Sequence, residues 1–229
     1  MARDDQTEDI YGDLLSVGEE PAPDEVAVEP EPQQEVKPPS PSGKTAWAYT
    51  ISEHENFAPH IQDGVLSLAC CMAFIRQHAK VGEWVIGVGT VSTGRRLVFA
   101  ALITGEMTRA QYWEKYGNTR LDSIYRPTPD GGYEQVPNIW HGEKRVKYDM
   151  QSNRVLLSTK FHNFSRGHYY EWSDPSGIEF PDEFSFLRVK GIRNSGKKFY
   201  NIPESFFKWM DGEQQEELQT LDDPERILP

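Results

Sequence analysis

The sequence has 229 residues, and its charge is unevenly distributed. Residues 1–44 hold 12 acids against 3 bases, which accounts for −9 of the formal net charge of −12. The same residues include 7 of the 16 prolines and no Trp, Phe, Cys or His. This composition predicts a disordered acidic, Pro-rich arm over 1–44, followed by one folded domain over 45–210 and an acidic tail over 211–229.

Several classes of protein are excluded or disfavoured. No run of about 18 apolar residues occurs, so no membrane-spanning helix is expected. The N-terminus lacks the apolar core of a signal peptide, and the two cysteines, Cys70 and Cys71, cannot form a disulfide framework. We therefore expect an intracellular protein, cytoplasmic or, in a eukaryote, nuclear. No ligand spacing indicates a metal or a cofactor, and we expect none.

The arm contains a small apolar segment, Asp9–Leu15, in an acidic setting. It is a candidate docking segment for a protein partner, and the alternative is a chance cluster in a tail. If the segment does dock, the chain acts as an interaction adaptor.

Alternating and periodic apolar residues predict the elements of the domain. Thr108 with Gln111 three residues later predicts a capping box. In the helix predicted around Cys70 and Cys71, the two thiols point about 100° apart and Arg76 faces outward. The predicted strands are 45–51, 65–68, 84–90, 97–104, 154–159 and 186–190, and the predicted helices are 69–79, 108–116 and 203–210. Irregular interleaving of strands and helices favours the α+β class.

Two further segments carry alternatives. Gly87 and Gly89 lie inside a predicted strand, where they indicate either close backbone packing or space for a flat ligand. Residues 117–153 form a long polar connection, which makes them a candidate binding loop. Residues 192–201 are expected to be a basic turn.

Motifs for several chemistries are absent. The sequence has no phosphate-binding glycine loop, no zinc-ligand spacing and no nucleophile elbow. A thiol of Cys70 or Cys71 at a helix N-terminus would have a lowered pKa, and simple burial of both cysteines is the alternative. In contrast, aromatic residues make up 12% of the chain and alternate with Arg and Lys beyond residue 110, a combination that suits stacking on bases and contact with phosphates.

The middle of the chain resembles a known family. The segments that carry the resemblance include 57–59, 66–71, 75–84, 87–89, 97–100, 112–113, 122–125, 140–141, 149 and 154–158. In this order they resemble the nucleotide modification associated domain of type two. The resemblance covers about residues 46–170 and leaves the extension 178–229 outside. Two positions depart from the family pattern, because Ser123 replaces an Asn and Arg126 replaces a His.

The resemblance implies an association with systems that modify DNA or nucleotides. A second similarity, to EVE/PUA-like domains, implies a small curved mixed β-sheet or partly closed barrel with a few short helices. Many such domains bind a modified base in an aromatic-walled pocket.

Together these observations favour recognition of a nucleotide or base over catalysis. We expect Asp122 or Asp149 to accept a hydrogen bond from the base, and Ser158 or His141 to contact another edge. The expected aromatic walls are Phe57, Trp84, Trp113, Tyr125 and Trp140, and the expected phosphate contacts are Lys144, Arg145 and Lys147. The alternative is an enzyme that modifies a base or nucleotide in the same pocket, with Asp122, His141 and Asp149 as acid–base groups.

Overall fold

A computed structural model describes residues 43–51, 57–139, 141–165, 177–189 and 196–221, with side chains described up to Glu213. All of these residues belong to one compact unit, residues 39–229. The acidic arm, with its Asp9–Leu15 segment, and Trp140 lie outside the described residues.

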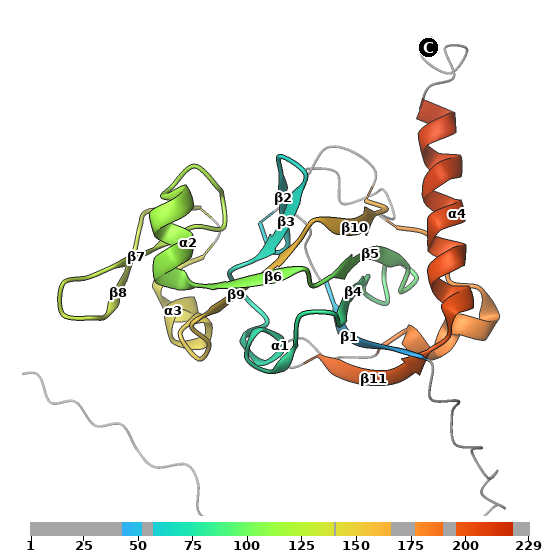
Figure 1. Cartoon of the computed structure of the whole chain (residues 1–229), viewed down its shortest axis with the longest axis horizontal. Coiled ribbons are helices and arrows are strands. Elements are labelled where there is room, and N and C mark those ends of the chain that lie inside the picture. Colours follow the sequence, from blue (N-terminus) through green and yellow to red (C-terminus); the bar gives the residue numbers. More distant parts are fainter. Residues whose placement is uncertain (1–42, 52–56, 140, 166–176, 190–195, 222–229) are drawn as a thin grey trace, which may run out of the picture. The chain divides into compact units, whose positions relative to one another are not determined.

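The larger sheet contains five strands, which Figure 1 shows beside the long helix α4. The order is β10-β5-β4-β1-β11, and β1 and β4 are parallel whereas the other neighbours are antiparallel. The sheet is therefore mixed, as predicted. Its strands are β1 (Lys44–Thr50), β4 (Trp84–Val88), β5 (Leu97–Leu102), β10 (Lys160–Asn163) and β11 (Lys197–Ile202).

A second sheet has four strands in the order β2-β3-β9-β6, and β7 and β8 form a separate pair. These strands are β2 (His60–Gln62), β3 (Val65–Leu68), β6 (Gly105–Thr108), β7 (Tyr125–Pro127), β8 (Tyr133–Gln135) and β9 (Arg154–Ser158). The helices are α1 (Ala73–His78), α2 (Arg109–Tyr116), α3 (Glu143–Asp149), the 3-10 helix η1 (Asp182–Leu187) and α4 (Glu204–Leu221).

The α+β class is confirmed, whereas the described strands form open sheets and no closed barrel. Three sequence expectations were wrong in detail. The strand expected at 186–190 overlaps the end of η1, residues 197–201 lie in β11 rather than in a turn, and α4 continues to Leu221. No described helix is long and apolar enough to span a membrane.

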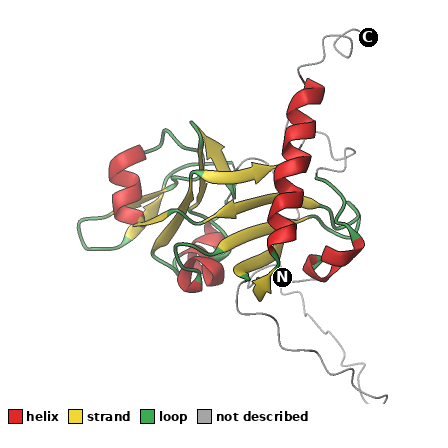
Figure 2. Cartoon of the chain, turned by 45° about the vertical axis from the view of Figure 1, so that its right-hand side comes forward, coloured by secondary structure: helices red, strands yellow, loops and turns green. Residues whose placement is uncertain are grey.

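Strand β4 is buried on both faces, and this explains the apolar runs of the larger sheet. Trp84, Ile86 and Val88 pack in a cluster with Phe206 and Met210 of α4, which crosses that sheet in Figure 2. The opposite face, with Val85, packs in a cluster that includes Phe99, Leu66 and Leu156, between the two sheets. Because β5 also contributes to both clusters, its sequence shows no clean alternation.

Gly87 is required for close packing inside this core. A Cβ atom at Gly87 would lie 2.3 Å from the ring of Phe99 and 2.4 Å from Ile51. The close-packing interpretation of this glycine is therefore confirmed, and the space above it is filled by the protein itself.

The predicted capping box at the start of α2 is present. The Thr108 hydroxyl accepts a hydrogen bond from the Gln111 N–H at 3.2 Å, and the Gln111 side chain accepts one from the Thr108 N–H at 2.9 Å. We predict that Thr108→Ala lowers the free energy of unfolding by about 1 kcal/mol, because one N-terminal amide loses its partner. Urea denaturation measures the change. Glu114→Ala, an exposed change on the same helix, is the control, and equal stability of the two variants would contradict the prediction.

Candidate functional site

Cys71 lies between β3 and α1, in a turn with unusual backbone. Its φ is 56° and that of Met72 is 38°, both in the left-handed region that non-glycine residues rarely occupy. The helix predicted from residue 69 therefore begins only at Ala73, because left-handed backbone cannot continue a right-handed helix. As a result, the thiol of Cys71 is partly exposed rather than buried in a helix face.

Both peptide groups of Cys71 are held by hydrogen bonds. Its N–H donates to Asp149 Oδ1 at 2.7 Å, and its carbonyl accepts from Arg76 Nε at 2.8 Å. Two bonds to charged groups offset the strain of the turn, which is about 1–2 kcal/mol per left-handed residue.

The Cys71 side chain faces His141 and, through it, Asp149. Cys71 Sγ lies 3.2 Å from His141 Nε2, and His141 Nδ1 lies 2.9 Å from Asp149 Oδ2. His141 comes just before α3 and Asp149 is its last residue. This one short helix therefore positions both partners of the thiol. A nucleophile, a base and a carboxylate that orients the base are the parts of a nucleophilic catalytic triad.

The electrostatics of the pair favour a protonated imidazole. Burial lowers the pKa of His141, but hydrogen bonds with Asp149 and Cys71 outweigh it and raise the pKa to about 9. Burial likewise raises the pKa of Asp149, but hydrogen bonds from His141 and Tyr125 bring it below its usual value. At neutral pH, Asp149 is thus a carboxylate and His141 carries a proton beside the sulfur of Cys71.

Two buried arginines fix the loop that carries Asp149. Arg76, with no exposed surface, donates to the carbonyls of Asp149, Ser152 and Arg154 at 2.8–2.9 Å. Arg109 donates to the Asp149 carbonyl at 2.7 Å and to the Ser152 carbonyl at 3.1 Å. The expected outward orientation of Arg76 was wrong, because its helix is only six residues long and packs this side chain against the end of α3.

Two predicted pocket residues complete the immediate surroundings. The hydroxyl of Tyr125 donates to Asp149 Oδ2 at 2.7 Å. The ring of Phe57 lies edge-on to the His141 imidazole, with ring centroids 4.7 Å apart. Of the predicted site residues, Phe57, Tyr125, His141 and Asp149 are thus brought together.

Asp122 belongs to an adjacent buried network. Its two carboxylate oxygens accept hydrogen bonds from Ser67 and Tyr112, both at 2.7 Å. Its carbonyl accepts one from the thiol of Cys70 at 3.2 Å. Burial raises the pKa of Asp122 and also that of the Cys70 thiol. Cys70 is therefore a neutral thiol turned toward Asp122, whereas its neighbour Cys71 faces His141.

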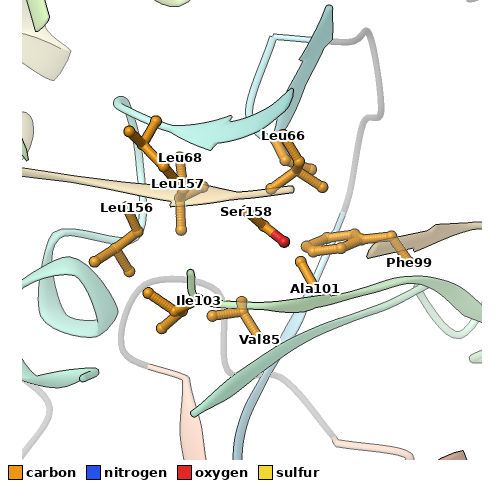
Figure 3. Close-up of a pocket in the computed structure, with 10 residues that line it drawn as sticks. Leu66, Leu68, Val85, Phe99, Ala101, Ile103, Leu156, Leu157 and Ser158 are labelled. Atoms are coloured by element: carbon orange, nitrogen blue, oxygen red, sulfur yellow. The ribbon is translucent and has the colours of Figure 1, made fainter. Parts of the chain in front are cut away.

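The structure places the other predicted residues elsewhere. Trp84 packs against Phe207 in the core beneath α4, with ring centroids 4.8 Å apart. Ser158 lines an otherwise mostly apolar cavity of about 10 Å³ between the sheets (Figure 3), and its hydroxyl donates to the Lys160 carbonyl at 2.8 Å. A cavity of this size holds one water molecule at most. Trp113 lies on α2, and Lys144, Arg145 and Lys147 are exposed on α3.

Sequence reasoning missed Arg76 and Arg109 and left Cys71 as an open alternative. Nothing in the local pattern distinguishes a buried arginine from an exposed one. A signal was nevertheless present, because the segments of the family resemblance include Cys71, Arg76, Tyr125, His141 and Asp149, residues that the structure gathers at one place.

A family model described as nucleotide modification associated domain 2 matches residues 44–227. The chain belongs to this family. The match includes residues 178–227, so the expectation that this extension lies outside the family was wrong. No curated protein and no solved structure matches the chain. Membership in the nucleotide modification associated domain 2 family associates the chain with nucleotide modification, as the family's name states.

We predict that Arg76→Met destabilises this domain by about 3–5 kcal/mol, because it removes the buried cation beside the Asp149 carboxylate and the Arg76 hydrogen bonds to the carbonyls of Cys71 and Arg154. Urea denaturation followed by tryptophan fluorescence measures the loss. Arg145→Met, at an exposed position on α3, is the matched control and is expected to change stability by less than about 0.5 kcal/mol. A loss for Arg76→Met no larger than that of the control would contradict the structural role of Arg76.

We also predict a dependence of stability on pH. The pKa of His141 rises from 6.5 to about 9 on folding. Its contribution is therefore fully present below about pH 6.5 and is lost as the pH rises toward 9, with a total on the order of 3 kcal/mol. Urea denaturation at a series of pH values measures this slope. His141→Gln should flatten the curve in that interval, and an unchanged slope would refute the assignment.

Proposed function

We propose that this domain is a thiol-dependent enzyme of nucleotide or base modification, with Cys71 as its nucleophile. The supporting observation is the hydrogen-bonded series Cys71 Sγ, His141 and Asp149, at 3.2 and 2.9 Å. This series matches the arrangement that activates cysteine nucleophiles. The family's association with nucleotide modification supports a nucleotide or a base in nucleic acid as the substrate class.

The positions of Cys71, His141 and Asp149 support a covalent reaction in two steps. Cys71 Sγ forms a bond to an electrophilic carbon of the substrate while the bond from that carbon to its leaving group breaks. The leaving group takes the proton held at His141 Nε2. In the second half of the reaction, Nε2 removes a proton from water or another acceptor, which bonds to the carbon and releases Sγ as a thiolate.

The surroundings support each role. Asp149 accepts the Nδ1–H of His141, which holds the imidazole with Nε2 toward the sulfur. Tyr125 and Arg76 hold Asp149 in turn. The cations Lys144, Arg145 and Lys147 are exposed on the helix that follows His141, and we assign them to contacts with substrate phosphates.

Recognition of a modified base without turnover, in a pocket of the EVE/PUA type, is the other hypothesis. It draws support from Phe57, whose ring lies beside His141. Two expected members of its pocket are engaged elsewhere, because Trp84 packs beneath α4 and Ser158 bonds the Lys160 carbonyl. A reader also has no need of a thiol aligned with an imidazole, so the geometry favours the enzyme.

Alkylation with iodoacetamide tests the nucleophile directly. At pH 7 we expect Cys71 to be modified at least about tenfold faster than a cysteine in an unstructured peptide, because His141 Nε2 lies 3.2 Å from its sulfur and a neighbouring imidazolium increases the reactivity of a thiol. Cys70 should react slowly, since it is fully buried and its pKa is raised. Tandem mass spectrometry distinguishes the two adjacent sites.

The variants make this test specific. His141→Gln should slow the alkylation of Cys71 by about tenfold or more, whereas Cys70→Ser should leave the rate unchanged. Mononucleotides and short oligodeoxynucleotides are then tested as protecting ligands, and the protein is analysed by intact mass for a covalent adduct at Cys71. The enzyme hypothesis is rejected if Cys71 is alkylated at the rate of a peptide cysteine and His141→Gln does not change that rate. Protection by one nucleotide without any adduct or turnover would favour the reader.

A further inference from the structure

A second chemistry is available to the same cluster, because it contains a thiol that the proposed enzyme does not use. One potential ligand atom from each of Cys70, His141 and Asp149 lies within 4.8 Å of the other two. All three residues are buried. Cys71 adds a second sulfur at 3.2 Å from His141 Nε2. Two sulfurs, an imidazole and a carboxylate thus converge from the β3–α1 connection and the two ends of α3.

The donor set selects the kind of ion. Thiolate and imidazole are preferred ligands of Zn²⁺ and other borderline-soft ions, whereas Ca²⁺ and Mg²⁺ prefer oxygen ligands. Ligand atoms of one tetrahedral zinc ion lie roughly 3–4 Å apart, given zinc–ligand bonds of about 2.0–2.3 Å. The ligand atoms of Cys70, His141 and Asp149 lie within 4.8 Å of one another, so shifts of roughly 1 Å would bring them to this spacing. The 100° separation predicted for the two thiols does not apply, because Cys70 and Cys71 precede α1, which begins at Ala73.

The charge of the cluster also permits a divalent ion despite two neighbouring arginines. Arg76 and Arg109 both lie against Asp149, which disfavours any added positive charge. A thiolate ligand from Cys70 and the carboxylate of Asp149 supply two negative charges to such an ion, and metal binding releases the protons of its ligands.

We propose that Cys70, His141 and Asp149 bind a Zn²⁺-class ion, with Cys71 bordering the site. An ion bound to His141 occupies the imidazole that activates the Cys71 thiol. In consequence, metal binding switches off the nucleophile. Inhibition in this sense rests on the proposed function, whereas the metal site itself does not.

Titration of the full chain with Co²⁺ tests the site, because thiolate ligation produces a near-ultraviolet charge-transfer band and tetrahedral geometry an intense visible band. We expect the wild type to show both bands at one equivalent. Cys70→Ala and His141→Gln should weaken binding by about a hundredfold or more. His162→Gln is the matched control, because His162 is a buried histidine on β10 that pairs with Asp211 at 3.2 Å. Thermal unfolding in the presence of a chelator verifies that each variant is folded.

A protection assay tests whether metal binding lowers the reactivity of the Cys71 thiol. Zn²⁺ should slow the alkylation of Cys71 at least about tenfold in the wild type and have little effect in Cys70→Ala. The proposal is overturned if Co²⁺ gives no thiolate band, or if folded Cys70→Ala binds as tightly as the wild type. The two proposals fail separately. Normal Co²⁺ binding with an unreactive Cys71 would reject only the enzyme, and a reactive Cys71 without Co²⁺ binding would reject only the metal site.

Discussion

The guanidinium of Arg76 is the contact on which the functional half of the molecule depends. It bonds the carbonyls of Cys71, Asp149, Ser152 and Arg154 while fully buried. A buried charge is unfavourable unless hydrogen bonds replace its lost hydration. Here one side chain receives four carbonyl partners and lies 3.8 Å from the Asp149 carboxylate. Arg76 therefore connects the β3–α1 turn, the end of α3 and the start of β9, and Arg109 adds bonds to the Asp149 and Ser152 carbonyls.

This arrangement explains why a strained turn can present a thiol. Left-handed backbone at Cys71 and Met72 is unfavourable for residues with a side chain. Asp149 stabilises this turn and also orients the base. One of its carboxylate oxygens accepts the Cys71 amide, and the other orients His141. The same carboxylate thus sets the position of the nucleophile and of its base. The left-handed turn directs the two adjacent cysteines to different networks. Cys70 bonds the Asp122 carbonyl, whereas Cys71 faces His141.

The sequence predicted what local patterns determine. The strands near 45–51, 65–68, 84–90, 97–104 and 154–159 and the Thr108 capping box follow from side-chain preferences within a few residues. The site was only partly predictable. Tyr125, His141 and Asp149 were named, but as walls and edges of a base pocket. Cys71 and Arg76 were misplaced because a helical pattern through residue 71 looks continuous, and only contacts with residues some 70 positions away break it.

Strand β11 has a consequence for where this domain can be cut. It pairs with one side of β1, and η1, β11 and α4 place Phe184, Ile202, Phe206 and Met210 over the larger sheet. A fragment ending near residue 170 would leave β1 with an open edge and the apolar face of β4 in water. Open edges and apolar faces are templates for intermolecular pairing. The autonomous folding unit therefore extends at least through Met210, and shorter fragments would be prone to self-association.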